Sequence, residues 1–364
     1  MKITDIRFAR SVVPLVTPFT TALRSVDCIE DLIVIIETDQ GVLGYGSAPS
    51  TPVITGDTHS SILAAIRQIY LPLLKGRDVQ QLNQLTYLVH ASMQGNYSAK
   101  AALEIALYDL WGKFHQAPLY KLLGGGEPTL RTDLTISLGK QDKMLADCER
   151  AIAAGFEVLK IKVGKDLAQD ITSVTGIYQQ VAGRAKLRLD VNQGWSAKQT
   201  VFALRQLESQ GVELELIEQP VKGDDLDAMR YVTQRITTPV MADESAFSPK
   251  QVIELITTGA ADIINIKLMK TGGLSRALHI ADIAQTYQLP CMMGCMLEGN
   301  VGVTAAAHLA VAKSTTISLI DLDGPALGQY DPVIGGACFD KATIRLSPGD
   351  GLGIESIEGL TDWV

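Results

Sequence analysis

The chain has 364 residues, of which 46% are hydrophobic, and its formal net charge is −8. This length suits one large domain with a smaller one, and an acidic balance without a basic patch argues against nucleic acid as a partner. We expect no signal region and no transmembrane run. The five scattered cysteines fit a reducing compartment better than a disulfide framework. The expectation is a cytoplasmic protein with neither a nucleic acid nor a membrane partner.

The first part of the chain is predicted to form a small α+β unit. Residues 3–50 have the pattern of a β meander, with strands at 32–38 and 42–46. Polar loops are predicted at 18–27 and 47–57. A helix is predicted over residues 99–115, with Ser98 as its N-cap.

From about residue 132, short apolar strands alternate with longer amphipathic segments, as a series of βα units requires. The spacing is that of a (β/α) barrel. We therefore predict a barrel over 126–325, and a capping domain formed by 1–125 with a C-terminal return at 326–364. The eight barrel strands are expected to begin near Leu134, Val158, Leu187, Leu214, Val240, Ile263, Cys291 and Ile317.

The segment Val158–Gly164 carries two lysines in an otherwise apolar strand. Lys160 and Lys162 are two residues apart, so they project from the same face. Two ammonium groups side by side in an apolar setting would depress each other's pKa, which is how a lysine becomes a base near neutral pH. Considered alone, the segment fits a pair of edge-strand lysines that blunts aggregation equally well.

Carboxylates follow three successive predicted strands, at Asp190, Glu218 and Asp243. One carboxylate after a strand is usually a helix cap or a turn residue. Adjacent strand ends of a barrel, however, converge on one point at its C-terminal face. Like charges crowded there need a cation, and ligation by oxygen alone favours Mg²⁺ over zinc.

Further polar side chains end the later strands. Lys267 ends the sixth strand, so it and Lys162 on the second would flank a metal-bound substrate from opposite sides, as two bases that serve opposite faces. The alternative is that Lys267 only pairs with the carboxylates. On the last strand Asp321 and Asp323 share a face, and they suit either a turn or the capture of a cationic group. Met296, near the end of the seventh strand, is more typical of core packing.

Together these residues resemble the enolase superfamily, and within it the dipeptide epimerases of the muconate-lactonizing subgroup. The resemblance rests on Lys-Ile-Lys at 160–162, the three carboxylates, Lys267 and Asp-Leu-Asp at 321–323, and it covers essentially the whole chain. It implies a modified TIM-type (β/α)7β barrel with an α+β capping domain. Ser47 departs from the pattern, because relatives usually carry Glu there.

The resemblance also implies a function. It indicates an isomerase that uses Mg²⁺ for a 1,1-proton transfer at the α-carbon of the C-terminal residue of a dipeptide, with L-Ala-D/L-Glu as the expected substrate. The metal, on Asp190, Glu218 and Asp243, would stabilise a dianionic enediolate. Lys162 and Lys267 would exchange the proton, while Lys160 would assist at the carboxylate. The implied substrate contacts are Asp321 and Asp323 for the α-ammonium, Arg24 for the glutamate carboxylate, and Thr135 and Met296.

Alternatives remain open at this point. An N-acylamino acid racemase, an o-succinylbenzoate synthase or a muconate cycloisomerase would share the apparatus, but none has a free ammonium that needs Asp321 and Asp323. A non-catalytic barrel binding protein is expected to lose catalytic positions, whereas all of these remain chemically competent. A homo-oligomer is compatible with a barrel of this size, although no stretch of the sequence requires one.

Overall fold

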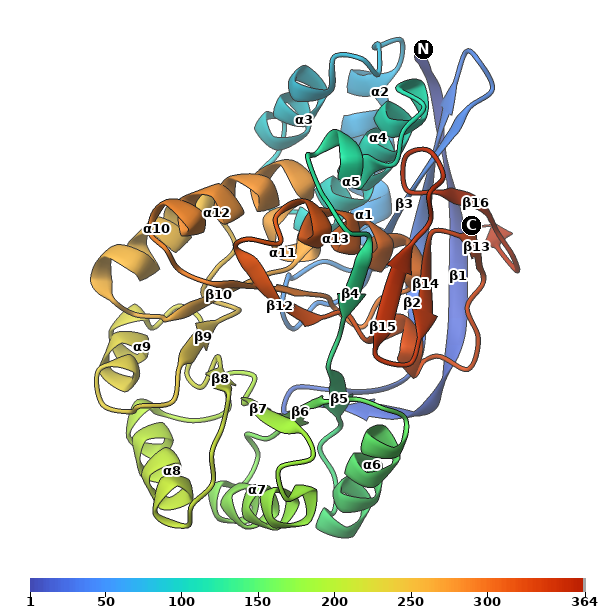
Figure 1. Ribbon diagram of the computed structural model, residues 1–364. Coiled ribbons are helices and arrows are strands. Elements are labelled where there is room, and N and C mark those ends of the chain that lie inside the picture. Colours follow the sequence, from blue (N-terminus) through green and yellow to red (C-terminus); the bar gives the residue numbers. More distant parts are fainter. Residues whose placement is uncertain (363–364) are drawn as a thin grey trace.

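The computed structural model describes residues 1–362. An eight-stranded parallel sheet curls into a nearly closed barrel, and a four-stranded antiparallel sheet stands beside it (Figure 1). The expected fold class, a modified (β/α)7β barrel with an α+β cap, is confirmed. None of the helices among the described residues is long and apolar enough to cross a membrane.

The barrel strands lie next to one another in chain order, each parallel to its neighbours. Strand β7 begins at Lys186 rather than Leu187, and β8 at Leu216 rather than Leu214; the other starts are as expected. The strands are β5 (Leu134–Ile136), β6 (Val158–Lys162), β7 (Lys186–Asp190), β8 (Leu216–Glu218), β9 (Val240–Ala242), β10 (Ile263–Ile266), β11 (Cys291–Gly294) and β12 (Ile317–Asp321).

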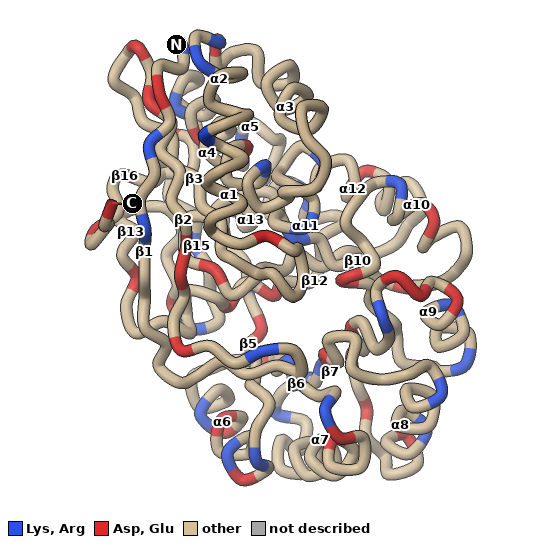
Figure 2. The backbone as a smooth tube through the Cα atoms, turned by 180° about the vertical axis from the view of Figure 1, so that it is seen from behind, with Lys and Arg blue, Asp and Glu red and all other residues tan. Residues whose placement is uncertain are grey.

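Helices surround the barrel on its outer side (Figure 1). Several begin at a side chain that accepts a backbone N–H of the first turn, such as Asp166, Ser196 and Ser248, which satisfies a donor that the helix leaves free. The helices are α6 (Gln141–Ala153), α7 (Leu167–Val181), α8 (Ala197–Ser209), α9 (Leu226–Thr233), α10 (Pro249–Thr258), α11 (Leu268–Thr271), α12 (Leu274–Thr286) and α13 (Asn300–Ala312). Basic and acidic residues are interspersed along these outer helices (Figure 2).

The cap combines a sheet with helices packed on it. Its strands follow the order β17-β1-β2-β3. Gly46 lets the long helix α4 approach β3, because a Cβ there would lie 1.9 Å from the carbonyl oxygen of Ala102. The elements are β1 (Ile3–Thr20), β2 (Ser25–Thr38), β3 (Leu43–Pro49), β17 (Thr361–Asp362), α1 (His59–Ala65), the π-helix η1 (Ile66–Tyr70), α2 (Leu71–Leu74), α3 (Leu82–Ala91), α4 (Tyr97–Phe114) and α5 (Leu119–Leu122).

After the barrel the chain returns to the cap, and its last strand, β17, pairs with β1 (Figure 1). This arrangement agrees with a C-terminal return, while the boundaries at 125/126 and 325/326 stay a prediction. The remaining elements are β4 (Thr129–Arg131), the 3-10 helix η2 (Gly324–Leu327), β13 (Val333–Gly335), β14 (Ala337–Asp340), β15 (Thr343–Leu346) and β16 (Ile354–Ile357).

Two local predictions are wrong. The expected loop over 18–27 is mostly strand, because β1 continues to Thr20 and pairs there with Ser25 at the start of β2. Ser98 is not an N-cap but lies inside α4, whose N-cap residue is Asn96. The backbone N–H of Ser98 donates to Asp57 Oδ2 over 2.9 Å, so a residue from the preceding loop satisfies one of the donors that the first turn of the helix leaves free.

Candidate active site

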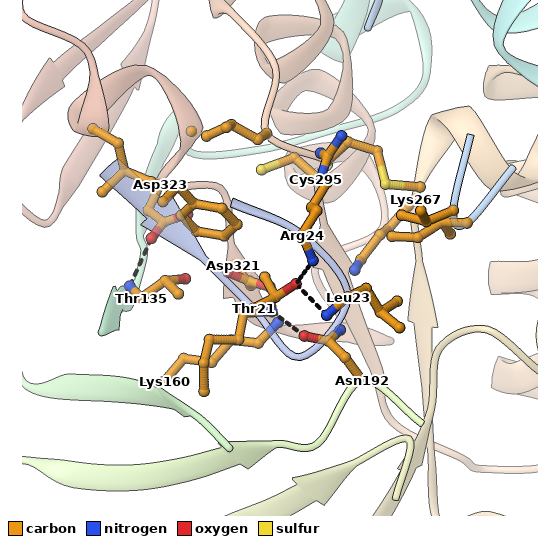
Figure 3. Close-up of a pocket in the computed structure, with 18 residues that line it drawn as sticks. Thr21, Leu23, Arg24, Thr135, Lys160, Asn192, Lys267, Cys295, Asp321 and Asp323 are labelled. Atoms are coloured by element: carbon orange, nitrogen blue, oxygen red, sulfur yellow. Dashed lines mark hydrogen bonds and ion pairs between the residues drawn. The ribbon is translucent and has the colours of Figure 1, made fainter. Parts of the chain in front are cut away.

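A cavity lies between the C-terminal ends of the barrel strands and the turn of the β1–β2 hairpin (Figure 3). The turn is held by Thr21, whose N–H donates to the carbonyl of Arg24 and whose hydroxyl oxygen accepts from Leu23. Residues from both the cap and the barrel therefore enclose the cavity. They include Phe19, Thr21, Leu23, Arg24, Val53 and Ile54 from the cap, and Thr135, Lys160, Lys162, Asn192, Lys267, Cys295, Met296, Leu297, Asp321 and Asp323 from the barrel side.

Strand register places the expected metal ligands side by side. Lys162 on β6 pairs with Asp190 on β7, and Asp190 pairs with Glu218 on β8. Asp243 directly follows β9 and Lys267 directly follows β10. Because parallel strands end together at one face of the barrel, these side chains form a continuous charged belt.

The lysines of the belt bridge its carboxylates. Lys160 Nζ lies 2.7 Å from an oxygen of Glu218 and 3.0 Å from one of Asp190. Lys162 Nζ lies 2.5 Å from Asp190 Oδ2. Lys267 Nζ lies 2.7 Å from Asp243 and 3.7 Å from Glu218. The structure thus brings together six residues that the sequence places up to 107 positions apart, from Lys160 to Lys267.

Three neighbours of this belt had no role in the sequence analysis. Lys270 Nζ lies 2.6 Å from Asp243 Oδ1. Asn265 Nδ2 donates to Glu218 Oε1 over 2.8 Å. Glu244 is buried, and neither of its carboxylate oxygens has a hydrogen-bond partner among residues 1–362. The available signal was positional, since all three polar residues lie within or just after the predicted strands that carry Asp243 and Lys267.

Buried carboxylates outnumber buried cations around this site. Burial, together with the charges of Asp243 and Asp190, raises the pKa of Glu244 to about 8. No group of three or more acidic, His or Cys side chains in residues 1–362 is arranged to hold a metal ion, because ammonium groups lie between the carboxylates. The carboxylates are Asp133, Asp190, Glu218, Asp243, Glu244, Asp321 and Asp323, and the cations are Lys160, Lys162, Arg188, Lys267 and Lys270.

The chemistry of this donor set nevertheless fits a hard divalent cation. All of the candidate ligands are carboxylate oxygens, the type that Mg²⁺ prefers. The excess of carboxyl groups over cationic side chains and the unpartnered Glu244 are what a site for an additional cation requires. Asp190, Glu218 and Asp243 could hold such an ion once the ammonium groups of Lys160 and Lys267 move away from them.

For Lys160, the expected depression of the pKa is replaced by a shift in the opposite direction. Burial lowers the pKa of Lys160, but the attraction of Asp321 and the neighbouring carboxylates outweighs it and raises that pKa well above its usual value. The pKa of Lys267 is also raised, because Asp243 and Glu218 outweigh the effect of burial. Repulsion between two lysines in an apolar setting led to the prediction, whereas the fold places carboxylates beside both Lys160 and Lys267.

A second group of side chains lies across the cavity. Asp323 Oδ2 accepts the backbone N–H of Thr135 over 2.6 Å, and Asp321 Oδ2 accepts from Lys160 Nζ over 2.7 Å. Figure 3 shows Thr135 and Asp323 on the opposite side of the cavity from Lys267. Burial and the charge of Asp321 raise the pKa of Asp323 to about 6. This pair of aspartates can bind a cationic group that enters the cavity.

Arg24 and Met296 also line the cavity, as the sequence analysis expected. Arg24 Nη1 donates to the carbonyl of Ser50 over 3.3 Å, and no carboxylate of residues 1–362 forms an ion pair with it. Burial lowers the pKa of its guanidinium. A half-buried cation of this kind is available to an anionic ligand. Met296 is 5% exposed, so its side chain serves the core as well as the cavity wall.

Two family models cover most of the chain. Residues 3–124 match the mandelate racemase/muconate lactonizing enzyme N-terminal domain, and residues 143–359 match the enolase C-terminal domain-like family. The chain belongs to the enolase superfamily. It is 47% identical to the L-Ala-D/L-Glu epimerase of Clostridium acetobutylicum, over 98% of this chain and 99% of that protein.

Solved structures of the superfamily agree with this assignment. A substrate-liganded complex of the L-Ala-D/L-Glu epimerase from Bacillus subtilis has a TM-score of 0.96 at 45% identity, and covers 98% of this chain and 99% of that one. The dipeptide epimerase of Enterococcus faecalis, complexed with Mg and L-Leu-L-Tyr, has a TM-score of 0.94 at 38% identity, with 98% and 100% coverage.

The departure at Ser47 lies away from the cavity of this superfamily member. Ser47 is fully buried in β3, and its hydroxyl has no hydrogen-bond partner among the described residues. A Cβ built on Gly302 of α13 would lie 3.2 Å from Ser47 Oγ and 2.1 Å from Glu298 Oε2. The residue therefore stands where the cap meets the barrel, and it contacts neither the lysines nor the metal-site carboxylates.

Proposed function

We propose that this protein is an isomerase, a Mg²⁺-dependent dipeptide epimerase that acts on the C-terminal residue of L-Ala-Glu. The observation that carries the proposal is one cavity that combines lysines from β6 and from the end of β10 with the aspartate pair at the end of β12. Strands β6 and β10 are four positions apart in the eight-stranded barrel, so Lys162 and Lys267 approach a bound substrate from opposite sides.

The two lysines perform the proton transfer. The neutral amine of one lysine takes the α-proton and becomes an ammonium, while the electron pair of the broken C–H bond delocalises into the substrate carboxylate. The ammonium of the other lysine then donates a proton to the opposite face of the α-carbon. Each turnover inverts the configuration and leaves the two lysines in exchanged protonation states.

The metal ligands of the proposal are Asp190, Glu218 and Asp243. When bound there, Mg²⁺ would supply positive charge at the substrate carboxylate, where negative charge develops during proton removal. Lys160 adds a fixed positive charge on the same side. Positive charge on these carboxylates also weakens their hold on the lysines, which lets an amine lose its proton at neutral pH.

Recognition of both ends of the dipeptide supports the choice of substrate. Asp321 and Asp323 bind the free α-ammonium through charge-assisted hydrogen bonds. Arg24 pairs with the side-chain carboxylate of glutamate, because a guanidinium matches a carboxylate in a bidentate manner. Thr135 orients Asp323, and Met296 contributes apolar surface. An N-acylated amino acid lacks the ammonium and would leave the aspartates unpaired.

The test is a dipeptide library incubated with the protein and Mg²⁺ in D₂O, with mass and chiral analysis of each product. We expect deuterium at the α-carbon and epimerisation of Ala-Glu, with little reaction of cationic dipeptides. High activity on N-acetylated or N-succinylated amino acids would contradict the dipeptide assignment. The absence of exchange in every substrate would favour a binding protein.

Metal removal tests the second part of the proposal. Chelation should abolish turnover and added Mg²⁺ should restore it. Glu218→Gln should weaken the response to Mg²⁺ while the fold, followed by circular dichroism, stays intact. Full activity of a demonstrably metal-free preparation would show that the carboxylate belt does not need a cation.

A further inference from the structure

The segment Cys295–Gly299, which follows β11, is one wall of the cavity. Cys295, Met296 and Leu297 all line it. The last two residues of the segment, Glu298 and Gly299, instead contact the junction with the cap. Because the segment has no regular secondary structure, its position depends on these contacts.

Two buried carboxylates hold this segment through its backbone. Asp31, on β2 of the cap, accepts the N–H of Gly299 over 2.8 Å. Glu298 accepts the N–H of Met296 over 2.9 Å. Asp31 is only 3% exposed and Glu298 only 2%. In each, the second oxygen has no hydrogen-bond partner among residues 1–362, so each carboxyl group serves one backbone donor of the segment.

Two glycines, Gly299 and Gly302, leave the space that the carboxyl groups of Asp31 and Glu298 occupy. A Cβ on Gly299 would lie 2.7 Å from Asp31 Oδ2. A Cβ on Gly302 would lie 2.1 Å from Glu298 Oε2. Such distances are too short for a side chain, so glycine at both positions lets the carboxyl groups approach the backbone.

An apolar contact joins the same segment to the cap hairpin. Val13 and Leu15 of β1, Ile29 of β2 and Leu297 of the segment form a small cluster separate from the main core. Phe19 and Val26, close to the hairpin turn, pack against this cluster. The hairpin that carries Arg24 and the wall that carries Met296 are thus attached to each other beside the cavity.

We propose that Asp31 and Glu298 are positioning residues of the cavity wall 295–299. Asp31 fastens the wall to the cap through Gly299, and Glu298 fixes the backbone of the wall from within through Met296. Without them, the wall and the Arg24 hairpin would no longer enclose the substrate as one unit. The charged groups that face this pair are Glu30 on β2 and Lys267 across the wall. The effect on the substrate rests on the proposed function, whereas the attachment of the wall does not.

The attachment can be measured without turnover, through the thiol of Cys295. Iodoacetamide labelling is followed at each cysteine by peptide mass spectrometry, with exposed Cys338 as the reference. Asp31→Ala removes the acceptor for Gly299, so labelling of Cys295 should accelerate by about tenfold, which corresponds to ~1.4 kcal/mol. Asp31→Asn keeps an acceptor oxygen and should label at the wild-type rate.

Glu298→Ala provides a second variant, in which Met296 loses its partner and Cys295 should again label faster. Ser47→Ala is the matched control, because it removes an unbonded hydroxyl from the same junction. If Cys295 were labelled at the wild-type rate in both Asp31→Ala and Glu298→Ala, the proposal would be overturned. Equal acceleration in Ser47→Ala or Asp31→Asn would also overturn it, since any change at the junction would then loosen the wall.

Kinetics with Ala-Glu give a second readout. If the proposed function holds, Asp31→Ala should raise KM more than it lowers kcat, because the enclosure of the substrate suffers and the lysines stay in place. Asp31→Asn should restore KM. An unchanged KM of Asp31→Ala alongside faster labelling would contradict the role in substrate enclosure. If the wild-type protein had no activity on Ala-Glu, the proposed function would be contradicted instead.

Discussion

Lys160 and Lys162 share one strand face but have different partners. Lys160 Nζ contacts three carboxylates, those of Glu218, Asp321 and Asp190. Lys162 Nζ contacts only one, Asp190, together with the amide oxygen of Asn192. An ammonium held by three carboxylates is the harder one to deprotonate. This difference supports the proposed roles, proton transfer for Lys162 and a fixed charge for Lys160.

The roles of Lys162 and Lys267 can be separated by substitution. Lys162→Ala and Lys267→Ala should each lower epimerisation by at least about 10²- to 10⁴-fold, the usual contribution of a general acid or base. Each variant should still exchange the α-proton of the one epimer that faces the remaining lysine. Mass detection of deuterium in L,L and L,D dipeptides separately checks this asymmetry, and wild-type epimerisation in either variant would exclude the two-base mechanism.

Arg24 should determine the preference for an acidic side chain. Arg24→Met keeps much of the apolar stem but removes the charge, so kcat/KM for Ala-Glu should fall by the roughly 2–5 kcal/mol that a desolvated charge pair typically loses. Ala-Leu and Ala-Phe should change little. Steady-state kinetics on the three dipeptides measure the effect.

Arg10 offers a matched control for that substitution. It lies on β1, the strand that leads into the turn with Arg24, but it pairs with Glu30 over 2.7 Å outside the cavity. Arg10→Met should therefore leave the ratio of Ala-Glu to Ala-Leu activity unchanged. Equal losses for acidic and apolar dipeptides in Arg24→Met would remove Arg24 as the residue that reads the side chain.

At the scale of elements, the start of α4 depends on Asp57 rather than on Ser98. Asp57 is buried and bonds the N–H of Ser98 in the first helical turn. Asp57→Ala should lower the free energy of unfolding by about 0.5–2 kcal/mol, the usual cost of a lost cap. Ser98→Ala should lower the free energy of unfolding by less than Asp57→Ala does, and urea unfolding of both variants measures the difference. The reverse order would restore Ser98 as the capping residue.

The sequence predicted regular elements better than it predicted their ends. Strand starts and carboxylates in the barrel could be found because each βα unit repeats one pattern, and parallel register then brings Asp190 beside Glu218. The hairpin end at Thr20 and Ser25 is polar on both strands, so no hydrophobic alternation marked it as β structure. The hydrogen-bond acceptor at the start of α4 is a loop residue, Asp57, 41 positions before Ser98. Local rules for helix N-caps do not detect such distant partners.

At the scale of the whole molecule, the cavity exists only where the cap meets the barrel. Phe19 lies on β1 and Arg24 in the β1–β2 turn, whereas Asp321 ends the last barrel strand and Asp323 lies just beyond it. The barrel motifs could be recognised individually, because each lies on its own strand. The positioning of the cavity wall by Asp31 and Glu298 could not be recognised, since an acidic residue in a strand and one in a loop resemble surface residues until the fold buries them.

Burial of Asp31 and Glu298 at this junction should make stability depend on pH. Burial and the charge of Glu30 raise the pKa of Asp31 to about 7, although the Gly299 hydrogen bond lowers it. Burial and the charge of Asp31 raise the pKa of Glu298 to about 8. The folded state therefore holds these protons more tightly than the unfolded chain does, so the favourable contribution is complete below about pH 4 and is lost as pH rises towards 8.

Urea unfolding at several pH values between 5 and 8 tests this sign. A carboxyl group that stays protonated only in the folded state costs up to about 1.4 kcal/mol of stability for each unit of rising pH. Asp31→Asn and Glu298→Gln cannot ionise, so each should show a smaller loss of stability between pH 5 and 8 than the wild type. A slope as steep as that of the wild type in both variants would mean that neither carboxyl group is protonated in the folded protein at pH 5.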